Sequence, residues 1–220
     1  MKAYKPFTSL VSTITPTVLG YRLLPFSLGM SINLKEGKSK FITGEYNGLC
    51  DINKVFLALK HDKTLIAEFI FAVLTCSNTY DEVKEEYANG EMVKEYQKLM
   101  KRLLKKPRKG NTKNQNKLWK PNLLYEIHRF CHYIKDGTDT LAYAIKNKKE
   151  TEIQSNPFEF EESVISTLLE TTNYTRDECY NLPMTETQNA YLIRQHKNDV
   201  IVIIDKKTSE LMELMKGGNT

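Results

Sequence analysis

The sequence predicts a mainly α-helical fold, with a helical body and an N-terminal region that forms a β-hairpin and an extended arm. Two observations lead to this prediction. From residue 51 onward, apolar residues recur three and four positions apart, and several of these runs follow an Asp or Thr suited to cap a helix. Residues 1–50 instead combine Gly and Pro with many β-branched residues. The chain has 220 residues, enough for one large domain or two small ones, and 40% of them are hydrophobic, as expected of a folded protein.

The N-terminal region, residues 1–50, contains the predicted hairpin. Met30–Leu34 alternates apolar and polar residues, residues 35–40 turn through Gly37, and Phe41–Thr43 resumes the pattern. The preceding residues 7–28 are apolar without a clear period. This is expected either of an extended arm laid over a neighbouring subunit or of irregular strands packed on the core of the same chain.

The first helical half covers residues 51–106. Asp51 and Asp62 are suited to cap two successive helices, and the second of these, residues 65–76, is apolar nearly all round and is therefore expected at the centre of the fold. Asp81 opens a polar helix that ends at Asn89-Gly90. The last helix of this half, residues 91–106, is basic and amphipathic and ends at Pro107. Its apolar side is expected to carry Val93, Tyr96, Leu99, Met100, Leu103 and Leu104.

The second helical half covers residues 121–220. The expected helices contain residues 123–134, 141–145 and 160–169, and two capping boxes, Thr175–Glu178 and Thr185–Gln188, introduce two more. The run Val200–Ile204 keeps helical spacing with its neighbours but is almost entirely β-branched. A helix is favoured over a strand at residues 199–205, and a strand there would make the fold α+β.

The charge of the chain is concentrated in one segment. Between Lys98 and Lys120 there are ten Lys or Arg residues and no Asp or Glu, so the formal net charge is +5 overall and −5 for the remainder. Residues 107–117 lack large apolar side chains, which predicts a basic loop at 107–120 between the two halves. The segment is a solvated surface, a phosphate-binding surface, or a contact for an acidic partner, including a second copy of the chain. The candidate contact residues are Lys101, Arg102, Lys105, Lys106, Arg108, Lys109, Lys113 and Lys117.

The sequence contains little that indicates catalysis. His128, Cys131 and His132 have spacing that can bind zinc on one helix face, but Cys131 also lies on an apolar stripe, which favours a buried thiol. Glycine-rich phosphate loops, nucleophile elbows and HExxH patterns are absent from the sequence. We therefore expect a protein that is not an enzyme and takes no cofactor, metal or small-molecule substrate. The four cysteines include no CxxC pair, which predicts reduced thiols in a chain made in the cytoplasm. No apolar run is long enough to span a membrane.

The segment Leu168-Leu-Glu-Thr-Thr-Asn-Tyr-Thr-Arg-Asp-Glu-Cys-Tyr-Asn-Leu-Pro-Met184, followed by a helix, resembles a segment of small helical proteins of tailed bacteriophages. The Lys-, Asn- and Tyr-rich composition is similar to that of phage proteins from AT-rich hosts. The resemblance implies a virion structural or assembly protein of the neck or tail.

Together these observations predict a homo-oligomeric ring or connector subunit that contacts other virion proteins and is located in the virion. The expected subunit contacts are the aromatic residues Tyr4, Phe7, Tyr21, Phe26 and Trp119. The alternative is a nucleic-acid-binding accessory protein that places the cations of residues 98–120 on DNA phosphates.

Overall fold

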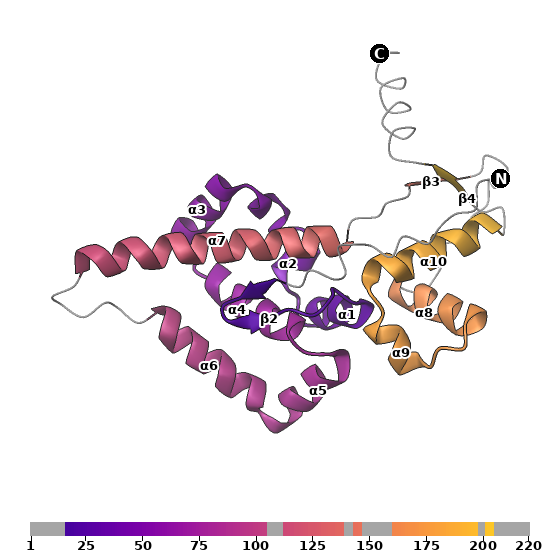
Figure 1. Ribbon diagram of the computed structural model, residues 1–220, viewed down its shortest axis with the longest axis horizontal. Coiled ribbons are helices and arrows are strands. Elements are labelled where there is room, and N and C mark those ends of the chain that lie inside the picture. Colours follow the sequence, from indigo (N-terminus) through magenta and orange to yellow (C-terminus); the bar gives the residue numbers. More distant parts are fainter. Residues whose placement is uncertain (1–15, 105–111, 139–142, 147–159, 198–200, 205–220) are drawn as a thin grey trace, which may run out of the picture. The chain divides into compact units, whose positions relative to one another are not determined.

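The computed structural model describes residues 16–104, 112–138, 143–146, 160–197 and 201–204 (Figure 1). The chain forms two compact units, residues 1–137 and 138–220, which are considered separately below. Both are built mainly from helices, which confirms the predicted fold class.

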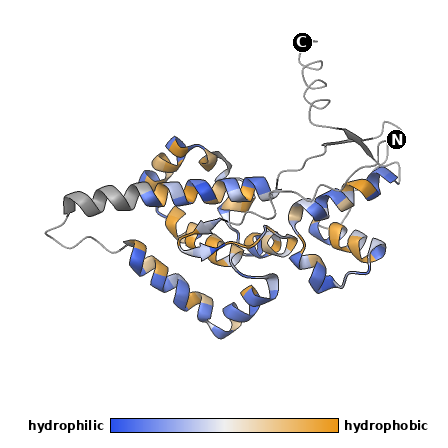
Figure 2. Ribbon diagram, viewed as in Figure 1, coloured by the Kyte–Doolittle hydropathy of each residue, from blue (hydrophilic) through white to orange (hydrophobic). Residues whose placement is uncertain are grey.

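The first unit is organised around a central helix. Its elements are β1 (Thr17–Val18), β2 (Tyr21–Arg22), α1 (Leu28–Glu36), α2 (Lys40–Thr43), the short 3-10 helix η2 (Asn47–Cys50), α3 (Ile52–His61), α4 (Leu65–Cys76), α5 (Tyr80–Asn89), α6 (Glu91–Leu104) and α7 (Thr112–Thr138). Helix α4 packs against α1, α2, α3 and α6. Hydrophobic residues are concentrated in α4, whereas hydrophilic ones alternate with them along α6 (Figure 2). The predicted central position of residues 65–76 is therefore confirmed.

An aromatic cluster forms the core of the first unit and holds α7 in place. The ring of Phe130, from α7, lies 5.2 Å from Phe41 of α2 and 5.6 Å from Phe69 of α4, in edge-to-face contacts. All three side chains are buried. Edge-to-face pairs at this distance add to the free energy gained by burial. Helix α7 thus belongs to the same core as the helices that precede the basic segment.

The predicted hairpin at residues 30–43 is wrong. Residues 28–36 form helix α1, whose first turn is capped by the Ser27 hydroxyl, which accepts a hydrogen bond from the Met30 N–H. The helix is buried on nearly every side, including its polar residues Ser31 and Asn33. Because burial on all faces removes the period of 3.6 from the sequence, the short apolar–polar alternation resembles a strand.

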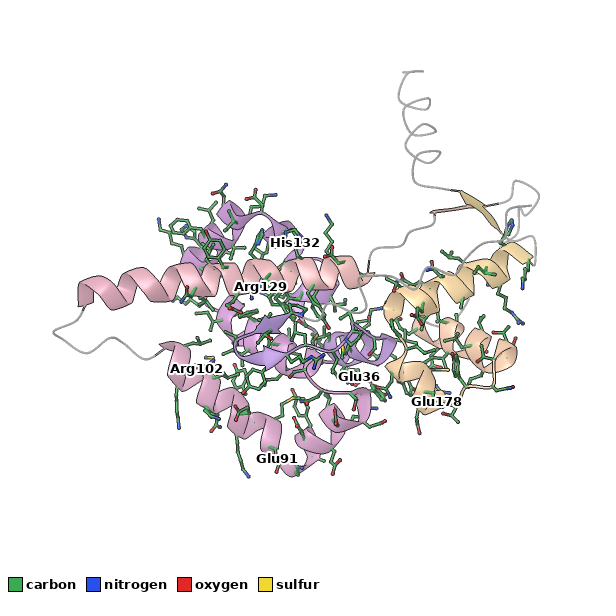
Figure 3. All side chains as sticks on the ribbon, in the orientation of Figure 1. Glu36, Glu91, Arg102, Arg129, His132 and Glu178 are labelled. Atoms are coloured by element: carbon green, nitrogen blue, oxygen red, sulfur yellow. The ribbon has the colours of Figure 1, made fainter. Side chains whose placement is uncertain are left out.

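The hairpin of this region lies earlier in the chain, at β1 and β2, where Val18 pairs with Tyr21 across a two-residue turn. Both turn residues have positive φ, 54° at Leu19 and 91° at Gly20, as the turns that suit tight hairpins require. A leucine disfavours this conformation by about 1 kcal/mol. Tertiary hydrogen bonds offset that cost: the Leu19 N–H donates to Glu126 of α7 at 3.0 Å, and its carbonyl accepts from Arg102 of α6 at 2.9 Å. Arg102 and Arg129, from these two helices, are labelled in Figure 3.

Helix boundaries in the first unit follow the expected capping chemistry with two shifts. Asp51 caps α3 as predicted, by accepting a hydrogen bond from the Asn53 N–H. The polar helix α5 is capped by Thr79, in a capping box with Glu82, rather than by Asp81. Asp62 binds the N–H and hydroxyl of Thr64 ahead of α4, instead of a group within the helix. Gly90 ends α5 as predicted, with φ of 76°.

The basic segment is not a loop throughout. Residues 112–120 lie within α7, which runs for 27 residues, about 40 Å. The chain divides after Gly137 rather than at residues 107–120, where the boundary is predicted. The loop was expected because residues 111–117 lack large apolar side chains. Residues 111–120 also lack Gly and Pro, however, so this stretch can continue a helix whose later turns are held by packing.

The second unit contains α8 (Phe160–Thr171), α9 (Arg176–Asn181), α10 (Met184–Lys197) and the strands β3 (Tyr143–Lys146) and β4 (Ile201–Ile204). Helix α8 packs against α9 and α10 through buried residues that include Val164, Ile165, Leu168, Cys179 and Met184. The Thr175 capping box is confirmed. The second predicted box does not begin its helix, because α10 already starts at Met184.

Two helix predictions in the second unit are wrong. Residues 143–146 and 201–204 form antiparallel strands, with Tyr143 opposite Ile204 and Lys146 opposite Ile201. The β-branched run therefore follows its strand propensity once a distant segment pairs with it. Because the described residues contribute two short strands to this sheet and ten helices to the chain, the fold remains mainly α.

Candidate functional site

An open groove of about 340 Å³ lies between α4, α5 and α6 of the first unit. Its lining is mainly apolar and aromatic, and it consists of Gly37, Ala67, Glu68, Phe71, Leu74, Tyr87, Met92, Val93 and Tyr96. Two of these side chains stay largely exposed, Tyr87 at 48% and Val93 at 46%. The groove is therefore an apolar surface that the described part of the first unit leaves open to solvent.

The turn between α5 and α6 creates one side of the groove. Gly90 takes the left-handed conformation that ends α5 and lets α6 turn back along α4. Met92 and Leu99 then anchor α6, since both are at most 3% exposed. Val93 follows Met92 by one position and therefore points about 100° around the helix, toward the open side.

The other side of the groove depends on a close approach between Phe71 and Gly37. A Cβ atom at Gly37 would lie 2.4 Å from Cζ of the Phe71 ring, so a larger residue there would displace the ring. The ring of Phe71 lies 6.4 Å from that of Tyr87, at 66°. Glycine at position 37 is thus required for the ring to occupy its place in the lining.

The surroundings of the groove are acidic. Glu68 is the charged residue among those that line it. Burial and the nearby Glu68 carboxylate raise the pKa of the Tyr96 phenol. At the α5–α6 corner, burial and the charges of Glu91 and Glu82 raise the pKa of Glu86. The groove itself therefore presents an apolar and aromatic surface with one carboxylate, that of Glu68.

The structure divides the predicted polyanion contacts into three groups. Lys101 is exposed on α6, whereas the Arg102 guanidinium binds the Leu19 carbonyl of the hairpin. Lys113 and Lys117 lie within α7, in its first turns. Lys105, Lys106, Arg108 and Lys109 lie outside the described residues. The two helices thus bring the ends of the basic segment into one unit, but Arg102 already serves the fold.

The predicted subunit contacts are also distributed differently from the expectation. Phe26 is 4% exposed and packs against Tyr133 at 6.0 Å, so it fills the core of its own unit. The Tyr21 hydroxyl donates to Glu95 of α6, and burial together with this bond raises its pKa to about 12. Trp119 lies within α7, and Tyr4 and Phe7 lie outside the described residues.

Sequence reasoning missed the groove because it assigned Val93 and Tyr96 to the buried side of α6. The other residues expected on that side are Leu99, Met100, Leu103 and Leu104, and the width of the stripe is ordinary for a helix packed on a core, so the sequence carries no signal of the groove. Leu99 and Leu103 are buried, whereas Val93 at the edge is not.

The candidate zinc spacing on α7 has an environment that favours packing. The rings of His128 and His132 lie 4.6 Å apart, and Cys131 is 5% exposed. Burial raises the pKa of the Cys131 thiol to about 12, which keeps it protonated at neutral pH. Within the described residues no group of three or more His, Cys, Asp or Glu side chains is arranged to hold a metal ion.

A second hollow, of about 410 Å³, lies in the second unit between α8, α9 and α10. Its Arg176 guanidinium pairs with Glu162 at 2.8 Å and donates to the Tyr180 hydroxyl at 3.0 Å. The cation of this hollow is thus already bound by neighbouring side chains, and the groove of the first unit is the stronger candidate site.

None of the helices described is both long and apolar enough to cross a membrane. Comparison with protein-family models, with curated proteins and with solved structures finds no match to this chain.

Proposed function

We propose that this protein is a structural subunit of a tailed-bacteriophage virion, in the neck or tail, and that it works by assembly with other subunits rather than by catalysis. The observation that carries the assembly role is the open apolar groove between α4, α5 and α6. The position in a phage particle is supported by the resemblance of residues 168–184 to segments of small helical phage proteins.

The composition of the groove supports a protein partner. Tyr, Phe and Met are enriched in the buried centres of protein interfaces, and the groove presents Phe71, Tyr87, Met92 and Tyr96. Exposed side chains such as Tyr87 and Val93 gain free energy when a partner removes them from water. The rings of Phe71 and Tyr87 also contact each other at 6.4 Å, and side chains that are already packed lose less conformational entropy on binding.

The charge distribution along α6 supports an ordered, head-to-tail mode of assembly. The helix begins with Glu91 and has Lys101 and Arg102 in its last turn, and its acidic end joins the acidic helix α5. Its basic end leads into residues 105–120, which contain seven more cations. Ring subunits that bind head to tail use different surfaces on their two sides, and opposite charges on these surfaces fix the order of the subunits.

Two measurements test the proposed function. Size-exclusion chromatography with light scattering on the full chain should show a defined oligomer or concentration-dependent self-association. Mass spectrometry of purified phage particles from the source culture should detect the chain as a particle component. A chain that stays monomeric and is absent from the particles contradicts the proposal.

The exposed Lys101 and Lys98 support a second function, nucleic-acid binding. Replacing Lys98, Lys101, Lys105, Lys106, Arg108 and Lys109 by Gln should then abolish DNA retention and flatten its salt dependence. Arg102 should be left unchanged, because it holds the hairpin turn. Unchanged retention in the variant excludes this second function.

A further inference from the structure

We propose that His128 and His132 of α7 form a two-histidine binding site for a divalent transition-metal ion such as Zn²⁺. The two imidazoles are the protein ligands, and Cys131, which lies between them in the sequence, is not one. Figure 3 shows His132 on α7, away from α6. The site is thus separate from the groove between α4, α5 and α6, and it does not depend on the proposed assembly function.

The two imidazole rings have the separation that a shared ion requires. Their centroids lie 4.6 Å apart, with an interplanar angle of 66°. Zinc binds an imidazole nitrogen at about 2.0 to 2.1 Å, which places the ion about 3.2 Å from the ring centroid. Two imidazoles that bind one ion at about 90 to 110° therefore have centroids about 4.5 to 5.2 Å apart. The observed distance lies within this range, and because the χ2 torsion of histidine is broad, each ring can turn a nitrogen toward the ion at little cost.

Helix α7 fixes the two histidines on one face. Residues four positions apart on an α-helix lie one turn above each other, about 40° apart around the axis. The turns that carry them are held by Ile127, Phe130 and Ile134, which are at most 6% exposed. The backbone of the site is therefore rigid before an ion binds, and binding has only two side chains to order.

Both imidazoles are available to an ion. Each side chain is partly exposed, and neither takes part in a hydrogen bond or an ion pair with the described residues. A neutral imidazole keeps one nitrogen lone pair, which can bind a metal ion when no donor occupies it. The cation between the two histidines is directed elsewhere, because the Arg129 guanidinium donates to the Thr17 carbonyl of the hairpin at 3.2 Å.

The Cys131 thiol belongs to the core and not to the metal site. It is 5% exposed, and burial raises its pKa to about 12, whereas a metal ion binds the thiolate. Within the described residues no group of three or more His, Cys, Asp or Glu side chains is arranged to hold a metal ion. The described part of the chain therefore supplies two ligands, one from each histidine.

Two imidazole ligands select the class of ion. Imidazole suits Zn²⁺, Cu²⁺ and Ni²⁺, whereas Mg²⁺ and Ca²⁺ prefer oxygen ligands. Zinc takes four ligands in most protein sites, so two positions remain for water or for side chains of another molecule. Because the rings meet only when residues 128–132 are helical, a bound ion stabilises α7 in its folded form.

Calorimetric titration with zinc tests the site on the full chain, purified without a histidine tag and freed of metal by a chelating resin. We expect ZnCl₂ to bind with one ion per chain and to raise the melting temperature, and we expect MgCl₂ to do neither. His128→Gln and His132→Gln should each weaken zinc binding by at least about tenfold, because a single imidazole lacks a second ligand on the same helix.

Two variants serve as matched controls. His61→Gln removes an exposed histidine from α3, and Cys131→Ser removes the buried thiol beside the pair. Zinc affinity should be unchanged in both. Circular dichroism on each variant verifies the fold before the titrations are compared.

The result that overturns the inference is a native chain that binds no zinc, or zinc binding that survives both histidine substitutions. Loss of binding in Cys131→Ser also overturns it, because the thiol would then be a ligand. One ion per two chains, with the same dependence on both histidines, supports the site and shows that a second copy completes the coordination. A chain that self-associates but binds no zinc leaves the assembly function standing.

Discussion

The Tyr46–Asp62 pair gives the first unit a dependence on pH that can be measured. The Tyr46 hydroxyl donates to Oδ2 of Asp62 at 2.6 Å, and Oδ1 accepts from the N–H and hydroxyl of Thr64 at 2.8 Å and 2.7 Å. These bonds, the one from Tyr46 first, lower the pKa of Asp62 from its ordinary 3.8 to about 2. Lys40, at 3.8 Å, contributes less. The perturbation is Tyr46→Phe, which removes the hydroxyl and keeps the ring that packs on Phe41 at 4.9 Å.

The direction and size of the effect follow from the shift. A carboxyl whose pKa is lower in the folded state stabilises that state above its unfolded pKa, and this stabilisation is lost as the pH falls through the folded pKa. The full shift corresponds to about 2 kcal/mol, and because the Asp62 side chain is 28% exposed we expect about 1 to 2 kcal/mol in solution. Tyr46→Phe should remove about half of it, so the variant is less stable by about 1 kcal/mol at pH 6. The difference should shrink between pH 4 and pH 2.

Urea unfolding at a series of pH values, followed by circular dichroism, measures this difference. Lys40→Gln is the matched control, because Lys40 is the weakest of the causes that lower the pKa of Asp62 and its replacement should change the pH dependence less. A Tyr46→Phe variant whose stability difference from the native chain is the same at pH 6 and near pH 2 would refute the reasoning.

Three further substitutions probe the first unit. Phe130 is fully buried at the centre of the aromatic cluster, so Phe130→Ala should lower the free energy of unfolding in urea by about 3 to 5 kcal/mol. A decrease below about 1 kcal/mol would contradict the position of α7. Gly137→Ala places a Cβ atom 2.5 Å from the Cβ of Phe26. The resulting overpacking should destabilise the folded state by about 1 to 3 kcal/mol, more than the gain of about 1 kcal/mol from the higher helix propensity of alanine. A higher melting temperature for this variant would contradict the prediction. Arg102→Gln should speed hydrogen exchange at the Leu19 amide. It should change the free energy of unfolding by less than about 1 kcal/mol, because the hydrogen bond from Arg102 to the Leu19 carbonyl is exposed to solvent. Unchanged exchange would show that Arg102 does not hold the turn.

The predictions that succeeded rest on local chemistry. Asp51 caps its helix because a carboxylate beside free N–H groups is stabilised wherever it occurs, and Gly90 ends a helix because glycine adopts a left-handed conformation at little cost. The apolar run 65–76 identified the central helix, since only a buried helix carries so little polar surface. These features depend on neighbours within about four residues, so they can be predicted without a tertiary structure.

The failures occurred where distant segments decide the conformation. Residues 28–36 lose their helical period because they are buried on nearly every side. Residues 201–204 become a strand because residues 143–146 pair with them. The turn at Leu19-Gly20 has no typical hairpin sequence, and Glu126 and Arg102 from two later helices hold it in place. Each of these conformations depends on contacts with residues far away in the sequence, which a local sequence pattern does not identify.

The candidate site shows the same division. The sequence by itself determined a helical protein with its positive charge in one segment and with Val93 and Tyr96 on the apolar side of a basic helix. Only the tertiary structure decided that this side is wider than α4 covers, so that Met92 is buried while Val93 is exposed beside Tyr87 in an open groove. The tertiary structure also assigned Phe26 to the core and Arg102 to the hairpin. The physical reason is that periodicity shows which side chains avoid water, whereas exposure depends on how much of that surface the neighbouring helices cover.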